Sequence, residues 1–365
     1  MLGRQLPFLS VFIPFYLIFI MAGWKKTKEV FPAIIVTGVS FAVTQFLTSN
    51  FMGPELPDII SALVSMIALA IFLKFWKPKN TFHFKTESEV AATAQVEEKK
   101  YTGGQIFKAW SPFLVLTAII SLWGIPTVKI ALQGHYEGTN VILKAVNSIG
   151  SALSFLPEVP FVHNQILNGA GATIAAVYKL ELLAAAGSAI LITAFITKFI
   201  VKISFKDWFI TFGETLNELK FPTITIAAVV AFAYITNASG MSTTLGMALA
   251  KTGALFPFFS PFLGWLGVFI TGSDTSANVL FGNLQKITAN GIGMNEVLAL
   301  AANSSGGVTG KMISPQSIAV ACAAVGLAGR ESELLRFTFK HSIFLLLLVA
   351  IITFLQSNVL SFMVP

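Results

Sequence analysis

Two clusters of small polar residues, each with one charged side chain, interrupt apolar stretches in the last third of the sequence. The first runs from Thr271 to Asn278 and contains Asp274, and the second runs from Asn303 to Gln316 and contains Lys311. A charge is costly in hydrocarbon, and backbone without helical hydrogen bonds survives at membrane depth only against protein or a water-filled cavity. The two clusters therefore predict a binding site inside a membrane protein.

The residue types in both clusters suit the binding of a small carboxylate. Glycine and hydroxyl residues lower the cost of unwinding a helix, and Ser273 or Asp274 can cap a helix that restarts after the break. Ser314 and Pro315 are likewise signals for a helix start, close to the cation of Lys311. A helix that begins inside a membrane directs free N–H groups and the positive end of its dipole into the cavity, where they favour an anion.

The two charged residues each have more than one interpretation. Lys311 could supply positive charge for a substrate carboxylate, or it could form a structural ion pair or snorkel at a helix end. Asp274 could take up and release a co-transported proton, because burial favours the neutral form of a carboxylic acid, or it could simply cap a helix. The two side chains could also pair with each other in the empty site. Single glycines in the clusters could serve only close helix packing.

The composition excludes several classes of protein. Hydrophobic residues make up 55% of the 365 positions and charged residues only 11%, which leaves too little polar surface for a soluble domain. The net charge of +7 does not indicate nucleic-acid binding, because the lysines lie beside apolar spans. The single cysteine, Cys322, and four dispersed histidines form no disulfide framework or metal motif. We expect no cofactor, and we expect a protein that is not an enzyme.

Apolar runs of about 17 to 23 residues, long enough to cross a bilayer, position these clusters. Lysines and arginines flank alternate ends of the runs, which predicts a multi-pass topology with both termini outside. Further helices at the membrane surface or over a cavity are predicted at 141–156 and 205–219. The predicted spans lie at 6–22, 31–49, 58–76, 180–201, 222–238 and 342–364, and a shorter one lies at 111–125.

The sequence divides into three regions. Residues 1–79 contain three expected transmembrane helices, and residues 80–109 form an expected cytoplasmic polar loop. Residues 110–365 form an expected transmembrane transport region with broken segments at 271–278 and 303–316. Two broken segments rich in hydroxyl residues are typical of the midplane site of a secondary transporter.

Four long strings closely resemble the bacterial L-lactate permease family. They are GRQLPFLS from Gly3, TSNFMGPELPDIISALVS from Thr48, FFSPFLGWLGVFITGSDTSANVLFGNLQ from Phe258 and NSSGGVTGKMISPQSIAVACAAVGLAGRESELLRFTFKHS from Asn303. The resemblance runs from Gly3 to Pro365 and is far more specific than a short motif. It implies an all-α, polytopic transmembrane transporter of the ion-transporter superfamily type in the bacterial cytoplasmic membrane, with broken helices and a re-entrant hairpin. It also implies uptake of L-lactate, and of related 2-hydroxy monocarboxylates such as D-lactate or glycolate, with protons.

The resemblance also carries expectations for individual residues. Asp274 is expected to couple transport to protons. The expected substrate-binding residues are Gly272, Ser273, Thr275, Asn278, Asn303, Ser304, Gly306, Gly307, Thr309, Lys311, Ser314 and Gln316. The expected partners are a small monocarboxylate, protons and membrane lipids, without nucleic acid.

A different hypothesis concerns the extent of the chain. Members of the resembled family have further helices before the position where this sequence starts. The chain could therefore be a truncated, inactive or split C-terminal fragment that needs a separate N-terminal partner.

Overall fold

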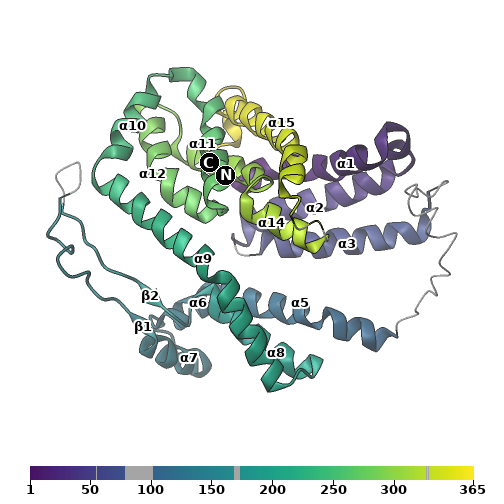
Figure 1. Ribbon diagram of the computed structural model, residues 1–365, viewed down its shortest axis with the longest axis horizontal. Coiled ribbons are helices and arrows are strands. Elements are labelled where there is room, and N and C mark those ends of the chain that lie inside the picture. The colour runs from purple at the N-terminus through teal and green to yellow at the C-terminus, as the bar shows by residue number, and fades with distance from the viewer. Residues whose placement is uncertain (55, 79–101, 168–172, 326, 328) are drawn as a thin grey trace. The chain divides into compact units, whose positions relative to one another are not determined.

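The computed structural model describes residues 1–365 with the exception of 55, 79–101, 168–172, 326 and 328. The described residues are mostly helical (Figure 1), and their strands are β1 (Ser154–Phe155) and β2 (Leu180–Glu181), which pair antiparallel. Six of the described helices are long and apolar enough to cross a membrane. The prediction of an all-α, polytopic membrane protein is therefore confirmed.

The chain forms two compact units. The first comprises Met1–Gln5, Val159–Ala176 and Gly213–Pro365, and the second comprises Leu6–Glu158 and Val177–Phe212. Both polar clusters identified in the sequence belong to the first unit.

The second unit contains the helices of the first half of the chain. In it, α1 bends at Gly23, whose backbone φ is 73°. Gly38 of α2 lies directly against α1, because a Cβ added there would be 2.7 Å from the carbonyl oxygen of Val11. The helices are α1 (Leu2–Glu29), α2 (Phe31–Phe51), α3 (Pro57–Phe75), α5 (Gly103–Gly124), α6 (Pro126–Gln133), α7 (Val141–Ala152), α8 (Ala186–Val201) and the beginning of α9 (Phe205–Ala238).

The polar loop expected at 80–109 is shorter than the sequence suggested. Residues 103–109 are helical and form the first turns of α5. The helix begins early because Thr102 and Gln105 make a capping box, in which each side chain bonds to the backbone of the other residue. Residues 80–101 of the expected loop lie outside the described residues.

Two further segment boundaries differ from the expectation. The span expected at 180–201 becomes helical only at Ala186, because its first two residues pair with β1 as strand β2. The surface helix expected at 205–219 and the span expected at 222–238 form one continuous helix, α9. The two residues that join them, Lys220 and Phe221, are themselves helical.

The first unit contains the helices that carry the polar clusters. Gly272 and Gly293 end α11 and α12 in the left-handed conformation, with φ of 68° and 72°. Asn295 caps α13 by accepting hydrogen bonds from two backbone N–H groups. The helices are the remainder of α9, α10 (Met241–Ala250), η1 (Gly253–Leu255), α11 (Phe256–Thr271), α12 (Asp274–Ile292), α13 (Glu296–Lys311), α14 (Pro315–Ala324), α15 (Glu331–Ser357) and η2 (Ser361–Met363).

The helix interruptions are narrower than the expected segments 271–278 and 303–316. Between α11 and α12 the helical hydrogen bonding stops only at Gly272 and Ser273. The residues 303–310, expected to be unwound, are helical and lie inside α13, so that expectation is wrong. The chain leaves the helix only at 312–314, before the proline that starts α14.

The small residues of α13 let this helix pack directly against the backbone of α11, and this packing holds the segment in a helix. A Cβ added at Gly264 would lie 1.8 Å from the carbonyl oxygen of Asn303. One added at Gly306 would lie 2.0 Å from the carbonyl oxygen of Pro261, and one at Gly310 would lie 2.4 Å from that of Trp265. The glycines therefore act first as packing residues, the alternative that the sequence left open.

Because of this contact, we expect a single added methyl group at Gly264 to destabilise the protein. Replacing Gly264 by alanine forces α11 and α13 apart, which we expect to cost about 1 to 3 kcal/mol, as overpacking of a dense core does. The matched control is Gly213→Ala in α9, where nothing lies within 4 Å of the added carbon. The measurement is the melting temperature of the detergent-solubilised protein. A Gly264→Ala variant as stable as the Gly213→Ala variant would contradict the close contact.

Candidate functional site

The turn between α11 and α12 presents the start of a helix to the interior of the first unit. Ser273 is the N-cap, and its side chain accepts a hydrogen bond from the backbone N–H of Ser276 at 3.3 Å. Thr271 stiffens the turn, because its hydroxyl donates to the carbonyl of Gly267 at 2.8 Å and accepts from the N–H of Ser273 at 3.2 Å. The first N–H groups of α12 have no acceptor within the helix and carry partial positive charge.

Asp274 is the first residue of α12, and its carboxylate is held between α12 and α13. One oxygen, Oδ2, accepts a hydrogen bond from the side-chain nitrogen of Asn278 at 3.2 Å. The other, Oδ1, is buried and has no hydrogen-bond partner among the described residues. Gly307 of α13 makes room for it, since a Cβ added there would lie 2.1 Å from Oδ1. Ser273, rather than Asp274, provides the helix cap.

Lys311 is the last residue of α13. Its ammonium group donates a hydrogen bond to the carbonyl oxygen of Gly272, at the C-terminal end of α11. A cation is favourable at that position because the last carbonyls of a helix carry partial negative charge. No ion pair joins Lys311 to Asp274 in the described structure, so the pairing considered from the sequence is not observed. The side chain of Gln316 lies beside the same turn, against Gly272.

A continuous network of polar side chains connects Asp274 to α13. The amide nitrogen of Asn278 donates to Asp274 and also to the hydroxyl of Ser304 at 2.8 Å. The amide oxygen of Asn278 accepts from Asn303 at 2.8 Å and from the Ser304 hydroxyl at 3.1 Å. Residues from both sequence clusters are therefore in direct contact.

The network extends to two residues that the sequence did not single out. Gln285 of α12 donates to the side-chain oxygen of Asn303 at 3.2 Å, and Ser260 of α11 donates to Gln285 at 2.7 Å. All three side chains are completely buried. Gln285 lies seven residues after Asn278, so both fall on one face of α12, and this spacing is the signal that could have identified it.

The remaining predicted residues have other contacts. Gly306 packs against Pro261, and the hydroxyl of Thr309 donates to the carbonyl of its own helix at Gly306, at 2.8 Å. Ser314 accepts from the N–H of Ser317 at 3.3 Å and so caps α14. Thr275 is exposed at the surface of α12.

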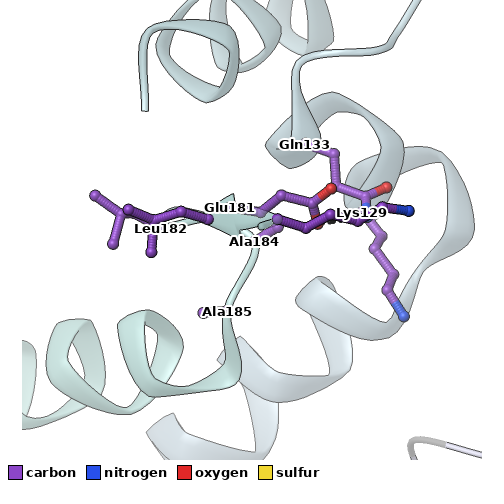
Figure 2. Close-up of a pocket in the computed structure, with 8 residues that line it drawn as sticks. Lys129, Gln133, Glu181, Leu182, Ala184 and Ala185 are labelled. Carbon is purple, nitrogen blue, oxygen red and sulfur yellow. Dashed lines mark hydrogen bonds between the residues drawn. The ribbon is translucent and has the colours of Figure 1, made fainter. Parts of the chain in front are cut away.

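A second location with charged residues lies in the other unit. A cavity of about 300 Å³ lies between α6, β2 and the start of α8, and Figure 2 shows the residues that line it. Its charged side chains are Lys129, Lys179 and Glu181, and Glu181 accepts a hydrogen bond from Gln133 at 2.9 Å. Charges of both signs meet there, and none of its lining side chains has a buried polar atom without a partner. The cluster around Asp274 is therefore the stronger candidate.

Comparison with known proteins identifies the family of the chain. The sequence model of the L-lactate permease family matches residues 1–360. No solved structure matches the chain.

Three curated relatives cover nearly the whole chain. The L-lactate permease of Bacillus subtilis (strain 168) is 68% identical, over 100% of this chain and 66% of its own length. The glycolate permease GlcA of Escherichia coli (strain K12) is 51% identical, over 98% of this chain and 64% of its own length. The L-lactate permease of the same strain is 48% identical, over 100% of this chain and 65% of its own length.

The chain thus spans just under two thirds of the length of these relatives, which are named as permeases and not as enzymes. Its apolar helices make it a multi-pass protein of the cell membrane. The family match over almost every residue confirms the resemblance of the four sequence strings, and the chain belongs to the L-lactate permease family.

Proposed function

We propose that this chain carries the carboxylate site of a secondary transporter that imports L-lactate together with protons. Related 2-hydroxy monocarboxylates, such as D-lactate and glycolate, belong to the same proposed substrate class. The observation that carries the proposal is the Asp274 carboxylate at the start of α12, whose buried oxygen Oδ1 has no hydrogen-bond partner among the described residues. The names of the relatives, L-lactate permease and glycolate permease, support the choice of substrate.

The proposed substrate site combines positive electrostatic potential with hydrogen-bonding groups. The substrate carboxylate binds the first N–H groups of α12 and the ammonium of Lys311, which exchanges its bond with the Gly272 carbonyl for one with the anion. The 2-hydroxyl group bonds to Asn278 or Ser304, whose side chains lie next to Asp274. Both ends of a short hydroxy acid are then recognised by adjacent groups.

The proposed coupling follows from charge repulsion. An ionised Asp274 beside the site repels a substrate carboxylate, because two like charges in a low-dielectric environment destabilise each other. Protonation of Asp274 removes that repulsion, so the proton and the anion bind best together. Release of the proton on the inner side then favours release of the substrate.

The first test replaces the proton-binding group. In proteoliposomes, we expect Asp274→Asn to abolish accumulation of labelled lactate driven by a pH gradient, because an amide cannot carry the proton. Exchange of lactate for lactate, which needs no net proton movement, should persist. The control is Asp207→Asn, at an exposed position in the first turn of α9. Undiminished gradient-driven accumulation by Asp274→Asn would refute coupling through this residue.

The second test removes the cation. We expect Lys311→Gln to raise the KM for lactate at least about tenfold, the effect of losing roughly 1.4 kcal/mol of binding energy. Lys311→Arg should retain part of the affinity because it keeps the charge. The control is Lys286→Gln, which removes an exposed lysine paired with Glu296. An unchanged KM in the Lys311→Gln protein would exclude a role in anion binding.

The third test changes the space around Asp274. The methyl group of Gly307→Ala would displace the carboxylate, so we expect lactate binding to fall at least about tenfold while the protein still folds. Gly282→Ala is the matched control in α12, because its added carbon would meet only Leu300, at 3.6 Å. Binding is measured as the rise in melting temperature on addition of lactate. Equal responses of the two variants would contradict the proposed position of the site.

The separate N-terminal partner is tested by expressing the chain alone and together with the remaining part of a full-length relative. Uptake by the chain alone supports independent transport. Uptake only on co-expression supports the partner, and no uptake in either case by folded protein would overturn the proposed carrier.

A further inference from the structure

The amide side chains between α11, α12 and α13 form a chain of hydrogen bonds that leads from Ser260 toward Asp274. The hydroxyl of Ser260 donates to the side-chain oxygen of Gln285 at 2.7 Å, and the nitrogen of Gln285 donates to the oxygen of Asn303 at 3.2 Å. The nitrogen of Asn303 donates to the oxygen of Asn278 at 2.8 Å, and the nitrogen of Asn278 donates to Asp274 at 3.2 Å. Each amide thus uses its oxygen on one side and its NH2 group on the other.

Backbone carbonyl groups determine this direction, because a carbonyl can only accept a hydrogen bond. The NH2 group of Gln285 also donates to the backbone carbonyl of Ser260 at 2.8 Å. The NH2 group of Asn303 also approaches the carbonyl of Ala277, at 3.4 Å. If either amide were turned over, its side-chain oxygen would face a carbonyl oxygen without a proton between them.

Burial makes the direction costly to reverse. The side chains of Ser260, Gln285 and Asn303 have no exposed surface, so water cannot replace a lost hydrogen bond. In a low-dielectric interior, successive hydrogen bonds also polarise and strengthen one another. The orientation of Gln285 is therefore passed on through Asn303 to Asn278.

We propose that Gln285 is a positioning residue of the site, which holds the NH2 group of Asn278 toward Asp274 and so favours release of the proton from Asp274. Gln285 does not touch the proposed substrate position, and it acts through Asn303 and Asn278. This inference rests on the proposed function, because it assigns Gln285 a part in the proton step of that function.

The experiment compares Gln285→Met with the wild-type protein. Methionine has a similar size but leaves the oxygen of Asn303 without its donor. The Asn303 amide is then held by its long contact with the carbonyl of Ala277, at 3.4 Å, which we expect to be too weak to keep Asn303 and Asn278 from turning over, so that the NH2 group of Asn278 no longer faces Asp274. Loss of a donor favours the protonated carboxyl, so the pH midpoint of its titration should move upward by about half a unit or more. The readout is the infrared C=O stretching band of the protonated carboxyl group, identified by its absence in Asp274→Asn.

Two further variants distinguish positioning from general destabilisation. Gln356→Met removes another completely buried glutamine of the first unit, one that bonds to Gln5 and not to this network, and should leave the midpoint unchanged. Gln285→Asn keeps an amide but is too short to reach both Ser260 and Asn303, and it should shift the midpoint in the same direction if Gln285→Met does not fold.

Each outcome bears on one proposal or on both. A wild-type midpoint in folded Gln285→Met or Gln285→Asn overturns the positioning role and leaves the proposed transporter intact. A shifted midpoint together with pH-independent uptake by the wild type supports the positioning role and overturns proton coupling. If no carboxyl band depends on Asp274 at any pH, both proposals fail.

Discussion

The direct backbone contact between α11 and α13 is the constraint on which the candidate site depends. Gly264 and Gly306 allow each helix to touch a carbonyl group of the other, at distances that exclude any side chain. This contact places Asn303 and Ser304 next to the start of α12, within hydrogen-bonding distance of Asn278. A larger residue at the contact would separate these partners even though it touches none of them.

The same contact buries the polar side chains of the network, so they have few hydrogen-bond partners other than one another. Gln285 and Asn303 are completely buried, and each unsatisfied amide in such a place is expensive. Almost every polar atom of the network therefore has a hydrogen-bond partner, with one exception. The oxygen Oδ1 of Asp274 is buried without a hydrogen-bond partner in the part of the chain that the structure describes, next to a glycine that keeps space for it. An unsatisfied buried group in an otherwise complete network is where a proton or a ligand has most to contribute.

The position of Lys311 shows how a charge can be kept near a site without being neutralised. Its ammonium group bonds to a carbonyl at the end of α11, which holds the side chain by a dipole and not by a full negative charge. A carboxylate ligand competes easily with such a partner, because hydrogen bonds between two ionised groups are stronger than those to a neutral carbonyl. An ion pair with Asp274 would instead have cancelled both charges that the proposed mechanism uses.

Much of the fold and part of the site could be predicted from local features of the sequence. Long apolar runs placed most of the membrane helices, and Gly272 with Ser273 marked the interruption before α12, because composition and helix capping act over a few neighbouring residues. The family resemblance rested on long strings of residues, and it agrees with the match over residues 1–360.

Only the tertiary structure decided how the polar residues are used. The sequence pattern of α13 favoured unwinding and left close packing as an alternative, and the backbone of α11, some 40 residues earlier in the chain, selected the packed helix. The partners of Lys311 and Gln285 were likewise undetermined, because a side chain's contacts across helices depend on which faces meet. The sequence by itself established a membrane protein with two polar clusters, and the packing of three helices joined those clusters into one connected network of hydrogen bonds.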